Sequence, residues 1–249
     1  AEYLQAQGDF LIPILLTGNT GVAGYNHGFE RSRGGVLLVL DDDSCPRDAA
    51  ALDRGLALLE ADDRLGIVAC RIENPDGSLQ RTWNLPRDLE RPGPSMSFMG
   101  CGFFIRRGLF EAVGWYPGEF FLYQNELEVA IRTRLRGMAI RYEPACRVVH
   151  RGRPGQRPGW RRIYYPTRNT LWLIRRYFPA PLRWYLAASR LLIGFTRALW
   201  FRQPRAFLRA AREGLRTPLT PLPVPRALRR ELAPFRRQNC LWSQLLRLS

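Results

Sequence analysis

The 249-residue sequence predicts an α/β fold: a mixed, mostly parallel sheet with helices on both faces, followed by a C-terminal helical basic arm. Short apolar runs such as Val36–Leu40 and 65–71 have the continuous hydrophobicity of strands buried on both faces of a parallel sheet. Segments with helical patterning alternate with these runs, which is typical of an α/β sheet. Beyond residue 150 the composition changes to Arg-, Trp- and Tyr-rich helix interrupted by proline.

The remaining elements follow in chain order. Residues 11–16 are apolar and suit an edge strand, since Pro13 cannot donate a backbone hydrogen bond. Ser44–Pro46 is expected to break the chain after the strand at Val36–Leu40, and residues 144–150 are expected to be extended. We predict further strands over 97–106 and 139–142 and helices over 23–32, 48–61, 109–113 and 126–136.

Charge is divided unevenly along the chain. Residues 1–150 carry 16 Arg and 20 acidic residues, whereas residues 151–249 carry 22 Arg and only Glu213 and Glu231 as acidic residues. We therefore predict one folded domain over 1–150 and an Arg-rich helical region over 151–249, called the basic arm below. Such an arm suits a polyanionic surface: a membrane leaflet, a nucleic acid or an acidic partner.

Two classes of protein are disfavoured by the sequence. No run of 18 or more residues is both free of charge and apolar throughout, so no ordinary transmembrane helix is predicted. The five cysteines are scattered and form no C-x-x-C pair, which argues against a disulfide scaffold and a zinc knuckle. Reduced cytoplasmic thiols are expected at Cys45, Cys70, Cys101, Cys146 and Cys240.

Asp41, Asp42 and Asp43 directly follow the buried strand at Val36–Leu40. Ligands of open α/β sheets bind at the carboxyl ends of strands. Because alternate residues of an extended chain point the same way, Asp41 and Asp43 can converge while Asp42 diverges. Carboxylate clusters of this kind suit Mg²⁺ or Mn²⁺. The alternative is a solvated acidic turn in which Asp43 or Ser44 caps the next helix.

Two other segments contain candidate functional residues. Residues 120–132 place aromatic side chains before a helix start that bears Glu126 and Glu128, which lie about 200° apart around the helix. One glutamate can then face a cleft as a base while the other faces water; the alternative is an acidic first turn that interacts with the helix dipole. His150 can complete a metal site only if it approaches Asp41 or Asp43.

In their order along the chain, these motifs resemble those of family 2 glycosyltransferases, and of rhamnosyltransferase-like members in particular. The resemblance covers roughly residues 11–175. It is carried by NTGVAGYNHG at 19–28, LDDD at 40–43, the NPDGSL within 66–79, GCGFFIRR at 100–107, FFLYQNELEVAIR at 120–132, PACRVVH at 144–150 and YYPTRNTLW at 164–172. The family's opening strand–helix–strand would precede residue 11, so an N-terminally truncated chain is expected.

The resemblance implies a GT-A fold and an inverting, metal-assisted transfer of a sugar from a nucleotide-diphosphate donor, such as a UDP- or dTDP-sugar, to a cell-surface glycan or lipid-linked acceptor. By position it implies Glu126 as general base. The metal ligands for Mg²⁺ or Mn²⁺ would be Asp41, Asp43 and His150. The donor-side residues would be Asn19, Gly21, Asn26 and Asp42, and the acceptor-side residues would be Gly100, Gly102 and Arg168.

The basic arm contains two amphipathic patterns. Arginines recur within 182–201 at 183, 190 and 197, and a second stripe follows at 205, 209, 212 and 216. Basic helices bearing Trp, Phe and Leu suit an anionic membrane interface, so we expect a peripheral protein on the inner, cytoplasmic face of the plasma membrane. The alternatives are a helical subdomain packed on the sheet, a non-catalytic membrane-bound module, and nucleic-acid binding, which the absence of a recognisable reader motif disfavours.

Overall fold

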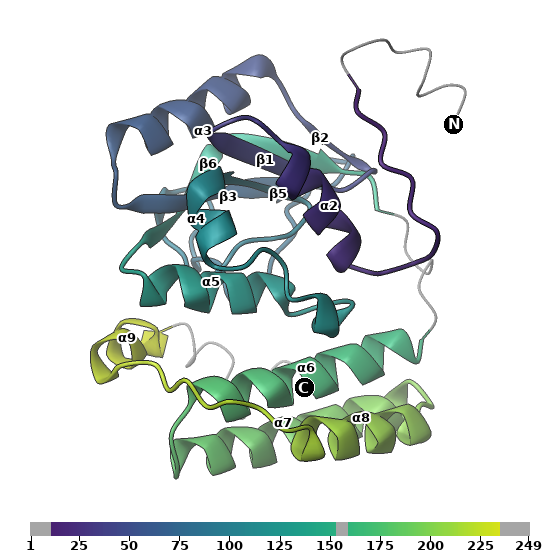
Figure 1. Ribbon diagram of the computed structural model, residues 1–249. Helices are drawn as coiled ribbons and strands as arrows, with labels where there is room; N and C mark the ends of the chain where they lie inside the picture. Colours follow the sequence, from purple (N-terminus) through teal and green to yellow (C-terminus); the bar gives the residue numbers. More distant parts are fainter. Residues whose placement is uncertain (1–10, 153–158, 235–249) are drawn as a thin grey trace.

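The computed structural model describes residues 11–152 and 159–234, which form a sheet covered by helices on both faces and a further helical layer (Figure 1). The strands are β1 (Val36–Leu40), β2 (Ser44–Pro46), β3 (Leu65–Glu73), β4 (Gly93–Pro94), β5 (Gly102–Arg106) and β6 (Ala139–His150). The helices are α2 (Ala23–Arg31), α3 (Ala49–Ala61), α4 (Arg107–Ala112), α5 (Asn125–Leu135), α6 (Arg161–Tyr177), α7 (Leu182–Trp200), α8 (Pro204–Arg216) and α9 (Arg226–Glu231), with a 3₁₀ turn, η2, at Gly118–Phe120. The α/β fold and the mixed sheet are therefore confirmed.

The sheet has the order β1-β5-β3-β6-β2, and β4 pairs separately with β6. Only β3 and β6 pair in parallel; the β1–β5, β3–β5, β2–β6 and β4–β6 pairs are all antiparallel. The expectation of a mostly parallel sheet is wrong. Helices bury both faces of this sheet, so its antiparallel strands are as continuously apolar as parallel ones, and hydrophobicity alone cannot give strand direction.

Several boundaries differ from the prediction. Residues 11–16 form no strand, whereas Ser44–Pro46, expected to break the chain, is the edge strand β2. The predicted strand over 97–106 begins only at 102. Strand β6 joins 139–142 and 144–150 into one element, and its register against β3 shifts between Cys70 and Arg71. That irregularity accommodates Pro144, which has no N–H for the ladder.

Separate apolar clusters fill the two faces of the sheet. Helix α3 packs on β3, β5 and β6, where Leu59 meets Val68 and Phe104. Helices α2, α4 and α5 cover the opposite face, and their buried side chains include Phe29, Phe110, Val129 and Ala130. The described cysteines, at 45, 70, 101 and 146, are unpaired, and Cys240 lies outside the described residues.

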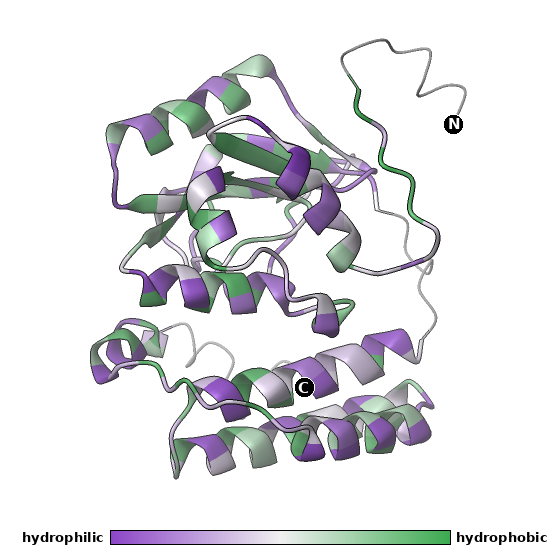
Figure 2. Ribbon diagram, in the orientation of Figure 1, coloured by the Kyte–Doolittle hydropathy of each residue, from purple (hydrophilic) through white to green (hydrophobic). Residues whose placement is uncertain are grey.

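Helix α6 of the basic arm packs against α5 rather than directly on the sheet, and α7 and α8 pack on α6 (Figure 1). Trp172, Leu173 and Tyr177 of α6 share one apolar cluster with Leu127 and Ile131 of α5. Hydrophilic and hydrophobic residues alternate along α6, α7 and α8 (Figure 2), so these helices bury one side and expose the other. Within the described ranges, no helix combines the length and hydrophobicity that crossing a bilayer requires.

Candidate active site

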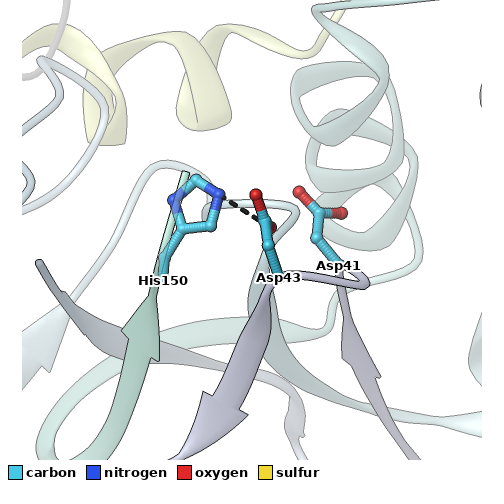
Figure 3. Close-up of side chains that lie close together, drawn as sticks. All are labelled: Asp41, Asp43 and His150. Atoms are coloured by element: carbon cyan, nitrogen blue, oxygen red, sulfur yellow. Dashed lines mark ion pairs between the residues drawn. The ribbon is translucent and has the colours of Figure 1, made fainter. Parts of the chain in front are cut away.

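Asp41, Asp43 and His150 come together at one end of the sheet (Figure 3). Asp41 follows β1, Asp43 immediately precedes β2, and His150 is the last residue of β6. Pairing of β2 with β6 sets Ser44 opposite His150 and so brings Asp43 beside the imidazole. One ligand atom of each residue lies within 4.8 Å of the others, and His150 Nε2 is 3.1 Å from Asp43 Oδ1.

The donor set of this cluster fits a divalent cation. Two carboxylates and an imidazole match the oxygen and nitrogen ligands of Mn²⁺ and also suit Mg²⁺ through the carboxylates. The His150 Nδ1 atom lies 3.0 Å from the amide nitrogen of Gln80, a contact on the ring side away from Asp43. A hydrogen bond to the ring nitrogen that does not face the metal fixes the orientation of a ligating imidazole.

The alternative of a helix-capping turn is not what the structure shows. The cap of α3 is Asp48, whose carboxylate accepts a hydrogen bond of 2.9 Å from the Ala51 N–H. Asp43 and Ser44 therefore do not cap this helix. Asp42 is exposed and outside the cluster, as its alternation with Asp41 and Asp43 predicts.

Tyr25 is a further residue at this cluster. Its hydroxyl donates a hydrogen bond of 2.7 Å to Asp41 Oδ1. Burial, and then the Asp41 charge, raise the pKa of Tyr25 well above its ordinary value, so the phenol stays protonated and able to donate. Neither Tyr25 nor Gln80 was predicted as a site residue. The Tyr25–Asp41 contact joins positions 16 residues apart and the Gln80–His150 contact joins positions 70 residues apart. Neither spacing forms a recognisable sequence motif.

Glu126 lies half-buried in the first turn of α5, next to Gly100. A Cβ atom added to Gly100 would come within 2.7 Å of Glu126 Oε1, so glycine leaves the space that this carboxylate occupies. Burial raises the pKa of the nearby Cys101 thiol to about 12, and the charges of Asp41, Glu126 and Asp43 contribute. Gly102, two residues after Gly100, pairs with Leu40, which directly precedes Asp41, so Glu126 lies at the same end of the sheet as the Asp–Asp–His cluster.

Glu128 does not face water, contrary to the expectation for one glutamate of the pair. Its side chain is fully buried between α5 and α6. The Oε1 atom is 2.6 Å from Arg132 and 2.8 Å from Arg176, and it accepts a hydrogen bond of 2.7 Å from the Tyr177 hydroxyl. Helical spacing separates the two glutamates correctly, but only the packing of α6 reveals that the second side chain is enclosed.

Of the predicted donor-side residues, Asp42 lies in the acidic loop, Asn26 lies in α2, and Asn19 and Gly21 lie in the segment that leads into α2. The Asn19 side chain accepts a hydrogen bond from Gly21 N–H, and Gly21 adopts a φ of 61°, which favours glycine. The Asn26 amide is paired with the backbone of Tyr116, donating to its carbonyl at 3.0 Å and accepting from its N–H at 3.1 Å. Asn26 thus anchors the Tyr116 backbone, while the donor contacts assigned to these residues remain predictions.

Two of the predicted acceptor-side residues are placed differently from expectation. A Cβ on Gly102 would lie 2.7 Å from Ile72 and 3.1 Å from Val148, so this glycine permits close packing within the sheet rather than approach of a substrate. Arg168 is buried, and each of its three guanidinium nitrogens donates to another group of the protein. Its side chain is therefore part of the packed α6 interface. The sequence pattern alone cannot distinguish such a buried arginine from an exposed one.

Comparisons with known proteins agree with this architecture. The family model for glycosyl transferase family 2 matches residues 1–128. The structure of GalNAc-T7 with UDP, GalNAc and Mn²⁺ superposes with a TM-score of 0.61 at 16% identity, covering 85% of this chain and 46% of that one. The mannosyltransferase PcManGT from Pyrobaculum calidifontis, in complex with GDP-Man and Mn²⁺, has a TM-score of 0.51 at 15% identity, covering 86% of this chain and 72% of that one.

A third solved structure, residues 1–349 of S. aureus TarS, gives a TM-score of 0.52 at 12% identity, covering 79% of this chain and 62% of that one. The chain thus spans under half of the GalNAc-T7 structure and somewhat under two thirds of this TarS structure. No curated protein matches the sequence. These likenesses support the GT-A fold, and the family match covers more than half of the residues. The chain belongs to glycosyl transferase family 2.

Proposed function

We propose that the protein is an inverting glycosyltransferase that moves a sugar from a nucleoside-diphosphate donor to an acceptor hydroxyl, with Glu126 as general base. The observation that carries this proposal is the convergence of Asp41, Asp43 and His150 at the end of the sheet where the half-buried Glu126 lies beside Gly100. The GalNAc-T7 and PcManGT structures, which contain UDP or GDP-Man together with Mn²⁺, support a nucleotide-sugar donor and a divalent cation.

Each residue has a defined role in this reaction. Asp41, Asp43 and His150 would hold Mg²⁺ or Mn²⁺, which when bound neutralises negative charge on the departing diphosphate. Glu126 accepts the proton of the acceptor hydroxyl as that oxygen bonds to the anomeric carbon. The bond from this carbon to the diphosphate oxygen breaks, and the diphosphate leaves with the electron pair. Attack opposite the leaving group inverts the anomeric centre.

The acceptor and the cellular location also belong to the proposal. A cell-surface glycan or a lipid-linked sugar at the inner face of the plasma membrane suits the exposed surface of α7, where Trp184, Leu192, Phe195 and Leu199 are between 41% and 62% exposed. These side chains lie at positions 0, 8, 11 and 15 of a helical repeat and therefore form one stripe. An exposed apolar stripe on a helix that also carries arginines suits an anionic lipid interface.

The test measures binding and turnover of UDP- and dTDP-sugars by the full-length protein with Mn²⁺, Mg²⁺ or EDTA. Asp43→Ala should abolish metal-dependent donor binding. Glu126→Gln should keep donor binding and lower turnover about 10²- to 10⁴-fold, the usual contribution of a general base. The matched controls, Asp63→Ala and Glu60→Gln, change exposed carboxylates and should behave as wild type.

Two outcomes would contradict the proposal. Wild-type turnover in Glu126→Gln would remove the base assignment, and donor binding that EDTA leaves unchanged would remove the metal site. If the wild-type protein binds anionic vesicles but no nucleotide sugar, a non-catalytic membrane module is the better description.

A further inference from the structure

The segment that leads into α5 has an unusual backbone. Phe121, Tyr123 and Gln124 have positive φ angles of 60°, 66° and 66°, a region that non-glycine residues rarely adopt. Holding such conformations costs free energy, so they persist only when neighbouring structure fixes them. This segment ends directly before the first turn of α5, which carries Glu126.

Asn169 of α6 supplies most of that support. Its Nδ2 group donates to the carbonyl oxygens of Phe120, Leu122 and Tyr123 at 3.1, 2.8 and 2.9 Å. The Asn169 side chain is completely buried, so water cannot replace these bonds. The two N–H bonds of a single amide are therefore shared among three carbonyl groups along the strained segment.

Arg168 completes the arrangement from the same helix. Its Nε donates to Asn169 Oδ1 at 3.0 Å, which orients the amide with its nitrogen toward the strained segment. Its Nη2 donates to the carbonyl oxygens of Glu119 and Phe120, both at 2.9 Å. The guanidinium also lies over the Trp172 ring at 4.2 Å, which fixes its plane.

Phe121 links the strained segment both to α6 and to the predicted donor side. The Phe121 ring stacks on Tyr165 of α6 with centroids 5.1 Å apart, while the Phe121 carbonyl accepts a hydrogen bond of 2.8 Å from Val22 N–H. Phe121 also packs against Gly21. The strained segment is thus held between α6 and the chain that leads into α2.

We propose that Asn169, oriented by Arg168, is a positioning residue that fixes residues 120–124 and thereby the direction in which Glu126 meets the acceptor. The proposal rests on the function proposed above, because it assigns Asn169 its effect through Glu126. Asn169 lies well beyond residue 128, where the family match ends, so a helix of the basic arm completes the catalytic unit. A displacement of about 1 Å at a reacting group can cost about 10²-fold in rate.

The decisive variant is Asn169→Leu, which keeps the side-chain volume and removes every donor. Turnover should fall about 10²-fold, while the dissociation constant of the Mn²⁺–donor complex and the KM for donor stay within about twofold of wild type. The acidic limb of the kcat–pH profile should also shift, because the Glu126 carboxylate changes its surroundings. Partial loss of folded protein would instead lower the apparent kcat by the same factor at every pH and would not shift that limb.

Two further variants sharpen the test. Gln124→Gly relieves strain at a position where φ is 66°, so adding it to Asn169→Leu should restore part of the lost turnover. Arg175→Met is the matched control: Arg175 lies on the same helix and donates to the carbonyls of Gly214 and Thr217, not to the strained segment. Its turnover and pH profile should equal those of wild type.

The proposal fails if Asn169→Leu retains wild-type kcat and pH profile, or if donor binding falls in parallel with turnover. Should Asn169→Leu not fold, Asn169→Ser leaves a polar group in the same pocket and is read by the same criteria. Wild-type and Glu126→Gln proteins are measured in the same series. Absence of Mn²⁺-dependent turnover in wild type would contradict the proposed function itself, whereas normal turnover in the Asn169 variants contradicts only the positioning role.

Discussion

The space available to Glu126 depends on one glycine. Gly100 lies in the loop before β5, and because it has no side chain, the Glu126 carboxylate can lie directly beside its backbone. The GCGFFIRR motif at 100–107 indicates that a glycine is needed at these positions, but the sequence cannot show which group occupies the space that a Gly100 side chain would fill. The neighbouring Gly102 illustrates the limit, since it faces Ile72 and Val148 inside the sheet.

Gly100→Ala should lower turnover about 10- to 100-fold with little change in donor affinity, because the added methyl would lie 2.7 Å from Glu126 Oε1 and displace the carboxylate. Steady-state kinetics and donor binding with Mn²⁺ measure the two effects separately. Gly108→Ala in α4 is the control, since a Cβ there meets no atom within 4 Å. Equal turnover in the two variants would show that Glu126 does not need this position.

A buried ionic group joins several elements near the Asp–Asp–His cluster. Glu73, at the end of β3, is 1% exposed and lies between Arg47, Arg71 and Arg147 at 3.1, 2.9 and 3.0 Å. Burial raises the pKa of Glu73, but the hydrogen bonds and charges of Arg147 and Arg71 outweigh burial and hold the pKa below 4.5. This carboxylate links β3 to β6 and to the residue that follows β2.

Glu73→Gln should lower the free energy of unfolding by about 2–4 kcal/mol at pH 7, because three arginines lose their shared carboxylate. A depressed pKa stabilises the fold above the unfolded-state pKa, and that contribution is lost as the pH falls through the folded-state value. The difference between wild type and variant should therefore shrink below about pH 4. Urea unfolding at pH 7 and pH 3 measures it, with the exposed Glu111→Gln as control; a difference independent of pH would exclude this role.

Element by element, local signals predicted helices better than strand pairing. Helices α2, α3 and α5 lie within one residue of their predicted ends because apolar periodicity and terminal residues are local. Strand direction depends on pairings between positions 34 or more residues apart, such as Ala69 with Phe103, and the β2–β6 pair joins Ser44 to His150, 106 residues away. The acidic loop was placed correctly because alternation along an extended chain is local, whereas Gln80 and Asn169 reach their partners only through the tertiary fold.

At the scale of the whole molecule, the basic arm has two sides. Its inner side, on α6, packs on α5 and holds the segment before Glu126. Its outer side on α7 bears the apolar stripe described above. The division of the chain into two parts after residue 150 remains a prediction. It is drawn from the distribution of charge, and that distribution does not show which helices pack on the first part.

Replacing Leu192 and Leu199 together by Ser should weaken binding to vesicles with anionic lipid at least about tenfold, since each exposed leucine would lose its contact with the lipid interface. Vesicle flotation at low and high salt measures binding, and salt should weaken it in wild type because arginines contribute. Leu56→Ser, on the exposed side of α3, is the control. Unchanged flotation of the double variant would place the lipid contact elsewhere or nowhere.

The strand order also has a consequence for the acidic loop. Strands β1 and β2 stand at opposite ends of the order, yet only residues 41–43 separate them along the chain. Four strand spacings in a flat sheet span about 19 Å, whereas the steps from Leu40 to Ser44 reach at most about 14 Å. The sheet must therefore twist or curve enough to bring the end of β1 within about 14 Å of the start of β2, and the three aspartates connect these two edge strands. A cation held by Asp41 and Asp43 would cross-link the two outer edges of the sheet.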